Sequence, residues 1–298
     1  MATFSVRGLI RRILAISFIA GTTLGVGGFY LALRSQALAD AKVNSRLLVS
    51  AASAVRSYTD ERVFPVMSQL PSDEFHEETV PSFAAQSVFR RVATEFPDYS
   101  YRETALNPTN SADRPTSAEV EIINAFRSNT ALAELSGIRD EGGNSLFYLA
   151  RPIRVKDGKC LSCHGKSDAA PASLIAKFGA SNGFGWRMDE TVGIQMLSIP
   201  VTKELRRAVE LALALGLALV GLFGVTYLAL TLALERALVR PLVTLSEAAE
   251  ALSREGEPRL ELPQGGATEI ARLSNAIKRL RASVENAIRR AMVARRGD

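Results

Sequence analysis

Hydrophobic residues gather in two long uncharged runs of this chain, and a large amphipathic segment separates them. The first run, Ile13 to Leu33, has no charged side chain for about 21 residues, and the second, Leu211 to Leu234, has none for about 24. A helix of roughly 20 apolar residues is long enough to cross the hydrocarbon core of a bilayer. We therefore expect a two-span membrane protein, with residues 34–210 between the spans.

The first run can also be interpreted as a cleaved signal peptide. Arg7, Arg11 and Arg12 before it resemble a positive n-region, and Ala37-Leu38-Ala39 resembles a small-residue cleavage site. The run is longer, however, than the usual apolar h-region of about 7–15 residues. We favour a retained helix, and the sequence alone leaves cleavage open.

The pattern between the two runs predicts three helices. Residues 36–63 carry apolar positions three and four apart, which predicts a long helix that leaves the first span and ends at Phe64-Pro65. Pro81 opens a second helix that ends at Pro97, and a capping box at Thr116 opens a third. The apolar positions of the long helix are Val43, Leu47, Ala51, Val55 and Tyr58.

Three other stretches, 99–106, 146–155 and 191–201, are rich in aromatic or β-branched residues and predict strands. Gly142 to Asn144 is the expected turn before the second of them. Residues 156–189 are rich in glycine and are expected to form a loop folded around a cofactor. A long helix, short helices and a small antiparallel sheet make the fold class α+β.

After the second run, residues 235–291 show two apolar seams with heptad spacing on either side of a connector, residues 255–268. One such pair of helices cannot bury both seams alone, so we expect two chains to form a parallel four-helix bundle, which makes the protein a homodimer. The order of span, helix, connector and helix resembles a HAMP linker. An arginine-rich amphipathic tail on the membrane surface is the alternative. The seams are Leu238, Leu242, Leu245, Ala249 and Leu252, then Ile270, Leu273, Ile277, Leu280, Val284, Ala287 and Ala291.

The net charge of +5 comes largely from arginines near the two runs. We interpret these arginines as membrane-flanking residues and expect no nucleic-acid partner. Basic residues lie near both ends of both runs, so the positive-inside rule does not decide the orientation.

Residues 159–166, KCLSCHGK, contain the only two cysteines, Cys160 and Cys163, and one of the two histidines, His164. A zinc site needs about four ligands, and only His76 lies outside this cluster. A redox disulfide would leave His164 without a role. Two cysteines followed at once by histidine are typical of c-type haem attachment, in which the histidine ligates the iron. We therefore assign one covalent haem c per chain to Cys160 and Cys163, with His164 as the proximal ligand.

The ligand opposite His164 decides whether the iron binds gases or only exchanges electrons. Met67 and His76 are the main candidates, although His76 lies in an acidic stretch typical of a solvated surface and Met67 suits a core position equally well. We expect Met188 and Met196 to be core residues, and Tyr58 is a weaker candidate. Phe184 and Trp186 are expected in the pocket wall, and Arg102 and Arg151 as possible partners of the haem propionates.

Several motifs in order carry a resemblance to a known family: DYSYRETALNPTN, FYLARPIRV, CLSCHG, the AP of DAAPASL, and GFGWRMDETVGIQMLSIPV. Over residues 40–202 the chain resembles the c-type haem family of PAS-like periplasmic sensor domains, formerly a domain of unknown function. The resemblance implies a PAS-like haem-binding fold used in membrane signalling. It implies no enzyme activity.

Haem c is attached outside the bacterial cytoplasm, so residues 34–210 are expected in the periplasm and both termini in the cytoplasm, with the spans in the inner membrane. The expected parts are the N-terminus (1–12), the first transmembrane helix (13–33), the periplasmic PAS-like haem domain (34–210), the second transmembrane helix (211–234), the HAMP-like helical coiled coil (235–291) and a tail (292–298).

The combination predicts a transmembrane sensor in which reduction or small-gas binding at the haem is relayed to the HAMP-like helices. No kinase, cyclase or methyl-accepting segment follows these helices in the sequence, so we expect a separate cytoplasmic output protein. The alternative is a membrane-anchored c-type cytochrome that exchanges electrons with a redox partner. A haem enzyme would need distal acid–base residues, and we expect none.

Overall fold

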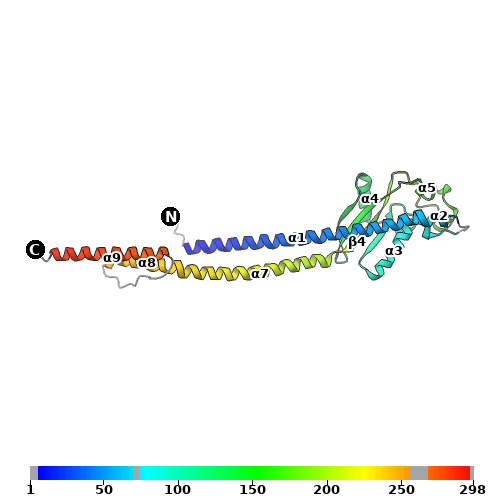
Figure 1. Cartoon of the computed structure of the whole chain (residues 1–298). Coiled ribbons are helices and arrows are strands. Elements are labelled where there is room, and N and C mark those ends of the chain that lie inside the picture. The colour runs from blue at the N-terminus through cyan, green and yellow to red at the C-terminus, as the bar shows by residue number, and fades with distance from the viewer. Residues whose placement is uncertain (1–5, 70–73, 256–267, 296–298) are drawn as a thin grey trace. The chain divides into compact units, whose positions relative to one another are not determined.

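The computed structural model describes residues 6–69, 74–255 and 268–295, and the chain divides into two compact units. The sheet unit comprises Tyr30–Glu210, and the helical unit comprises Met1–Phe29 with Leu211–Asp298 (Figure 1). The expected segment between the two apolar runs therefore corresponds to the sheet unit.

The N-terminal helix α1, Val6–Tyr58, is longer than predicted and does not stop at Phe64-Pro65. It continues through a π-helical turn, η1 (Thr59–Val63), into a last short helix, α2 (Phe64–Met67). In the π-helical turn the Phe64 N–H donates to the Thr59 carbonyl, five residues back. Such a widened turn relieves the clash between a proline ring and the preceding turn, so Pro65 is accommodated without ending the helix.

The sheet has four antiparallel strands in the order β1-β4-β3-β2. The strands β1 (Ser100–Ala105), β3 (Asn144–Arg154) and β4 (Thr191–Pro200) confirm the three predicted stretches. The edge strand β2 (Leu135–Glu141) was not predicted. It joins β3 through Gly142 and Gly143, whose φ angles of 59° and 82° suit the tight turn of a two-residue hairpin.

Two layers of helices cover the sheet (Figure 1). On one face α1 and α3 (Pro81–Glu95) pack on Leu197 and Ile199 of β4; on the other α4 (Ser117–Ser128) packs on Ile194 and Met196. Both α3 and α4 begin where predicted, and Thr116 forms the expected capping box with Glu119. The α+β fold class is therefore confirmed.

Of the predicted apolar positions of α1, Val55 packs against the core, whereas the others are exposed. Small residues, Ala41, Ser45 and Ala52 among them, are buried there, while Leu47 is 69% exposed on the opposite side. Val43 and Tyr58 are exposed as well. Small side chains let a helix approach a sheet closely, so residue size and not hydrophobicity alone selects the buried face.

Residues 156–189 are not one loop. They contain α5 (Gly158–His164), a 3-10 turn η4 (Ser167–Ala169) and α6 (Ala172–Phe178). The predicted loop is therefore wrong at the motif itself, because the Cys-x-x-Cys-His sequence lies on a short helix.

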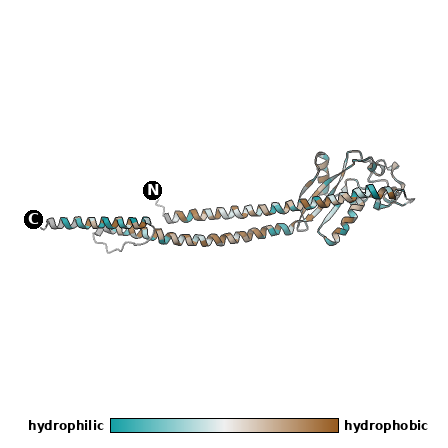
Figure 2. Cartoon of the chain, in the orientation of Figure 1, coloured by the Kyte–Doolittle hydropathy of each residue, from teal (hydrophilic) through white to brown (hydrophobic). Residues whose placement is uncertain are grey.

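The helical unit contains the apolar parts of α1 and of α7 (Thr202–Leu234), and Phe18 meets Phe223 edge to face at a centroid distance of 4.9 Å. The helical segments Gly8–Met67 and Thr202–Glu250 are long enough and apolar enough in composition to cross a membrane (Figure 2). These two helices are compatible with two spans.

A π-helical turn, η5 (Glu235–Val239), connects α7 to α8 (Arg240–Glu255), and α9 (Thr268–Arg295) follows. Leu245 and Ala248 of α8 pack on Ile270 and Ile277 of α9. Ala248 is buried where the predicted seam used its neighbour Ala249, which is exposed. Most of the connector and the side chains of Leu252 and Ala291 lie outside the described residues. The other predicted seam positions stay exposed in one chain: Leu238, Leu242, Leu273, Leu280, Val284 and Ala287.

Candidate cofactor site

The helix α5 presents the three motif residues on neighbouring turns. Asp157 caps it, because its carboxylate accepts a hydrogen bond from the Lys159 N–H at 3.0 Å. Cys160 precedes Cys163 by three positions and His164 by four. On a helix these spacings place Cys160 on the same face as the other two residues. Both thiols are partly buried and are not joined in a disulfide. The motif therefore has the cysteines and the histidine grouped for one ligand.

The segment that follows α6 holds the end of α5 in place. The Gly185 N–H donates to the Gly165 carbonyl at 2.7 Å, and the Trp186 N–H donates to the His164 carbonyl at 3.1 Å. These backbone bonds bring residues 183–186, more than 15 positions downstream in the sequence, beside the motif. The glycine-rich run GFGW thus forms one wall of the site, as expected for Trp186.

The imidazole of His164 is fixed at one edge and on one face. Its Nδ1 lies 2.8 Å from the Gly183 carbonyl oxygen, and its ring stacks on Trp186 with centroids 4.0 Å apart and planes 15° apart. A carbonyl can only accept, so Nδ1 carries the proton and Nε2 keeps its lone pair. Burial lowers the pKa of His164, and the hydrogen bond to Gly183 partly opposes this. A neutral imidazole with Nε2 available is the form that ligates a metal.

Gly183 is held by a second loop that the sequence analysis did not identify. Its φ of 85° is in the left-handed region, and a Cβ at this position would overlap the Thr109 side chain. Thr109 lies in the loop after β1, and its buried Oγ1 has no hydrogen-bond partner among the described residues. The loop therefore fixes the carbonyl that orients His164.

The helix α5 is tied to the end of the long helix. The Lys159 ammonium lies 3.7 Å from the Asp60 carboxylate in η1. Lys177 of α6 pairs with Glu77 at 2.8 Å, and Phe178 meets Phe75 edge to face at 5.7 Å. These contacts gather η1, α5, α6 and the 3-10 turn η2 (Glu77–Thr79) at one end of the sheet unit.

Both candidates for the second axial position lie next to these elements, in α2 and directly before η2. Met67 is the last residue of α2 and is partly buried. His76 precedes η2, where its carbonyl accepts hydrogen bonds from the Thr79 N–H and hydroxyl at 3.1 and 2.7 Å. It is partly buried, so it is not the fully solvated side chain that its acidic neighbours indicated. Their positions do not select one over the other, and both stay predictions.

The weaker candidates are elsewhere. Met196 is buried in the core against α4, as predicted, whereas Met188 is 48% exposed and the core prediction for it is wrong. Tyr58 is exposed. Arg102 donates to the Arg114 carbonyl at 3.2 Å, and Arg151 lies 3.8 Å from Glu134. These contacts engage both arginines with protein groups and give no support to a propionate role.

A buried acidic group lies between α1 and β1, and the sequence analysis missed it. Glu103, 2% exposed, pairs with Arg56 and accepts a hydrogen bond from the Tyr101 hydroxyl at 2.7 Å. Burial raises the pKa of Glu103, and the charge of Arg56 opposes the rise. Breaking such a buried pair leaves an uncompensated charge. The pair therefore anchors α1 to the sheet one turn before η1.

The profile of the Tll0287-like family matches residues 34–200, which is more than half of the chain. The chain belongs to the Tll0287-like family. The expectation of a haem-binding PAS-like family is confirmed at this level, and the match ends before the tail, so it does not test the HAMP linker. A solved structure of the cyanobacterial haem protein Tll0287 is similar to 51% of this chain and 94% of its own, with 22% identity and a TM-score of 0.39. No curated protein matches.

Among the described residues, no group of three His, Cys, Asp or Glu side chains is placed to hold a metal ion.

Proposed function

We propose that the sheet unit binds one haem c covalently and senses through it. Cys160 and Cys163 carry the thioether bonds, and His164 is the axial ligand. The single observation that carries this proposal is the hydrogen bond from His164 Nδ1 to the Gly183 carbonyl, because it leaves Nε2 free on a Cys-x-x-Cys-His helix. Membership of a haem-binding family supports the same cofactor.

The residues around His164 fit this role. Trp186 and Gly183 hold the ring in one orientation, and both cysteines remain partly exposed and so reachable for attachment. When bound, the haem iron supplies a one-electron redox change and a site for small ligands. The chain contributes the ligand, its orientation and a partly buried surrounding.

The proposed signal route leaves the sheet unit by β4. This central strand ends at Pro200, and α7 begins two residues later at Thr202. Two hydrogen bonds hold this join: the Ser145 N–H donates to the Thr202 hydroxyl at 2.8 Å, and the Val201 N–H donates to the Ser145 carbonyl at 2.9 Å. A displacement of the sheet would therefore be passed to α7 rather than absorbed in a linker.

A second route runs through α1. The Lys159 to Asp60 ion pair joins the haem motif to η1, and the buried Arg56 to Glu103 pair joins the same end of α1 to β1. For signalling, a change in the haem state needs to alter the free-energy difference between two helix positions by only about 1–3 kcal/mol, a typical coupling free energy.

The output in this proposal is the tail, residues 235–291, acting as a HAMP domain. In one chain α8 and α9 bury Leu245 and Ile270 against each other but leave Leu273 and Leu280 exposed. A second chain would cover this exposed seam in a parallel four-helix bundle. We therefore propose a homodimer whose HAMP domains repack between two states and act on a separate cytoplasmic kinase or cyclase.

The proposed location follows from haem attachment. The two apolar helices span a bacterial inner membrane, with the haem domain in the periplasm, and the termini and HAMP domain in the cytoplasm. A membrane-anchored electron-transfer cytochrome is the second candidate. It would use the same His164 site but would give no role to the exposed seam of α8 and α9. We propose no enzymatic activity.

The test is to express the full chain together with the haem-maturation machinery and to stain denaturing gels for haem. Cys160→Ser with Cys163→Ser should remove the stain, whereas Ser162→Ala, inside the motif, should keep it. The assignment would be contradicted if the double cysteine variant kept the haem stain, or if Ser162→Ala also lost it.

Optical spectra of the reduced protein then separate the stimuli. A shift on adding carbon monoxide would indicate an open or weakly held position and a gas sensor. An unchanged six-coordinate spectrum would indicate a strong protein ligand and a redox role. Met67→Ala or His76→Ala should open the position if that residue is the ligand, and Met188→Ala, an exposed methionine, is the matched control.

A further inference from the structure

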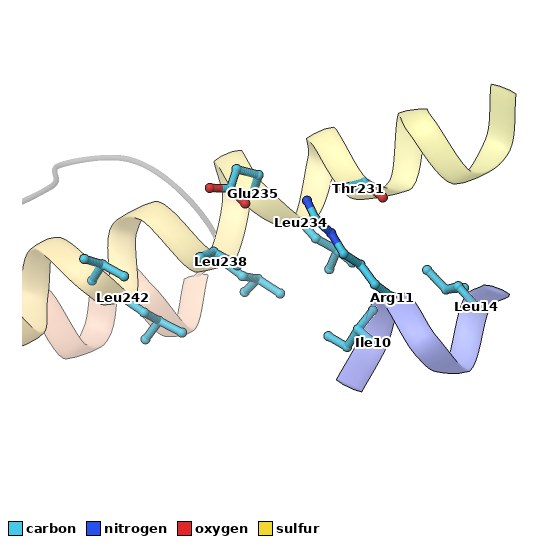
Figure 3. A pocket seen from close by; sticks show the side chains of 10 residues that line it. Ile10, Arg11, Leu14, Thr231, Leu234, Glu235, Leu238 and Leu242 are labelled. Atoms are coloured by element: carbon cyan, nitrogen blue, oxygen red, sulfur yellow. The ribbon is translucent and has the colours of Figure 1, made fainter. Parts of the chain in front are cut away.

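A cavity of about 260 Å³ lies in the helical unit, between the start of α1 and the junction of α7 with α8 (Figure 3). Most of its lining is apolar, with Leu14 from α1 and Leu234, Leu238 and Leu242 from the other side. Three polar side chains also line it: Arg11, Thr231 and Glu235. In Figure 3 the side chain of Arg11 extends from α1 toward Leu234 and Glu235.

Two hydrogen-bond donors in this cavity lack an acceptor. Arg11 Nε and Thr231 Oγ1 are both buried, and neither has a hydrogen-bond partner within the described residues. A buried donor without an acceptor is costly, and such groups are rare unless something else satisfies them. Two of them on facing helices of one apolar cavity indicate a ligand that brings oxygen atoms.

The donor types indicate which oxygens these are. A guanidinium binds the oxygens of a phosphate in a planar, charge-assisted pair, and a threonine hydroxyl can donate to a third oxygen. A phosphodiester carries one negative charge, which a single guanidinium can balance, whereas a phosphate monoester carries up to two. The one arginine of the lining therefore fits a phosphodiester better.

The position of the cavity indicates the source of the phosphodiester. Arg11 lies two residues before the first apolar run, and Thr231 and Glu235 lie at the end of the second. In the proposed two-span arrangement this is the level of the phospholipid headgroups at the cytoplasmic leaflet, where basic pockets between helices bind lipids. The leucine-lined walls suit the glycerol and acyl part of a lipid and offer nothing to a free phosphate ion.

We propose that this cavity binds the phosphodiester headgroup of a membrane phospholipid, with Arg11 and Thr231 as donors. The proposal rests on the two-span arrangement under the proposed function but not on the haem. The cavity includes residues of η5, the π-helical turn that leads into α8. Bound lipid would thus act where the second span passes into the tail.

The test measures lipid retained by the full chain, purified in mild detergent, by native mass spectrometry. Phosphatidylglycerol and phosphatidylethanolamine are titrated against a glycosyl diacylglycerol, which has the same acyl part and no phosphate. Arg11→Gln should weaken binding of both phospholipids about tenfold or more, the usual effect of losing a charged hydrogen-bond pair. Arg12→Gln is the matched control, because Arg12 is the next residue, carries the same charge and is exposed.

Thr231→Val keeps charge and shape and removes only the hydroxyl, so it tests the site even if Arg11→Gln inserts poorly. It should weaken phospholipid binding severalfold, and Arg11→Lys should bind with intermediate strength. Equal losses for the Arg11 and Arg12 variants, or equal binding of the glycolipid, would overturn the proposal. Displacement by millimolar inorganic phosphate would overturn the lipid source. Haem staining of the same samples reports separately on the cofactor, and membrane fractionation reports on the spans.

Discussion

His164 and Trp186 lie face to face, with ring centroids 4.0 Å apart and planes inclined by 15°. The same histidine is held at its edge by the Gly183 carbonyl, 2.8 Å from Nδ1. Face and edge together leave the imidazole little freedom to rotate, so the orientation of Nε2 is set by the protein before any iron is present. Trp186 is the only tryptophan of the chain, and its role can therefore be tested without interference from others.

Substituting Trp186 should change the iron environment without removing the haem. An aromatic stack contributes about 0.5–1.5 kcal/mol beyond its buried area. Trp186→Phe keeps a ring against His164 and should leave the reduction potential nearly unchanged. Trp186→Leu frees the imidazole and should shift the potential by up to about 60 mV and broaden the paramagnetic resonance signal. Redox titration of both variants, at equal haem stain, checks this; equal potentials for Leu and Phe would show that the stack has no positioning role.

Gly183 and Gly185 offer a matched pair of substitutions. Both have positive φ angles, 85° and 79°, but a Cβ on Gly183 would overlap Thr109, whereas a Cβ on Gly185 meets nothing within 4 Å. Gly185→Ala should therefore cost only the backbone strain, on the order of 1 kcal/mol. Gly183→Ala should cost about 2 kcal/mol or more and displace the carbonyl that orients His164.

Thermal unfolding and the optical spectrum of the two glycine variants distinguish these effects. The spectrum should change in Gly183→Ala and stay as in the parent chain in Gly185→Ala. Adding Thr109→Ala to the first variant should restore part of the stability, since it removes the Oγ1 that the new methyl would meet. If both glycine variants behave alike, the loop after β1 does not support the site.

The elements with local signals could be predicted from the sequence. The capping box at Thr116 and Glu119, the proline start at Pro81 and the aromatic stretches of β1, β3 and β4 depend on neighbouring residues, and each element begins within two residues of the prediction. The candidate ligand His164 was also found locally, from its adjacency to Cys163. For each of these features, the sequence signal lies within a few residues of the feature itself.

The features that depend on residues distant in the sequence were missed. The strand β2, with its sequence LSGIRDE, is polar and is held as an edge strand by its pairing with β3. The buried positions of α1 could not be selected from its apolar spacing, because Ser45 and Ala52 fit against the sheet and Leu47 does not. Gly183 and Thr109 are 74 positions apart, and no local pattern relates them. Tertiary packing decides each of these cases.

The stability of the sheet unit should depend on pH through Glu134. Its carboxylate accepts hydrogen bonds from Arg46 at 2.9 and 3.2 Å and lies 3.8 Å from both Lys42 and Arg151, so it joins α1 to β3. The hydrogen bond from Arg46, aided by these charges, lowers the pKa of Glu134. A lowered pKa means that the contribution is present above the ordinary carboxyl pKa and is lost as the pH falls through the lowered value.

Glu134→Gln should therefore lower the unfolding midpoint by roughly 2 °C at pH 7, and the difference should vanish in strong acid. Glu141→Gln, in an exposed pair with Arg139, is the control and should change the midpoint less. Circular dichroism melts between pH 2 and 7 provide the measurement. A midpoint difference that persists at pH 2 would show that lost packing, not charge, causes it.

The exposed seam of the tail predicts disulfide cross-linking between two chains. Leu280 is 62% exposed on α9, although it continues the heptad spacing of Ile270 and Ile277, which pack on α8. In a parallel two-fold bundle, equivalent seam residues face each other across the axis, whereas residues on the outer face do not. Leu280→Cys should thus form an intermolecular disulfide in membranes treated with a mild oxidant. Lys278→Cys, exposed on the same helix but outside the seam, should cross-link far less. Equal cross-linking at both positions would indicate random collision of chains. No cross-linking at either position would remove the basis for the proposed homodimer, and the exposed seam would then be covered by a different partner.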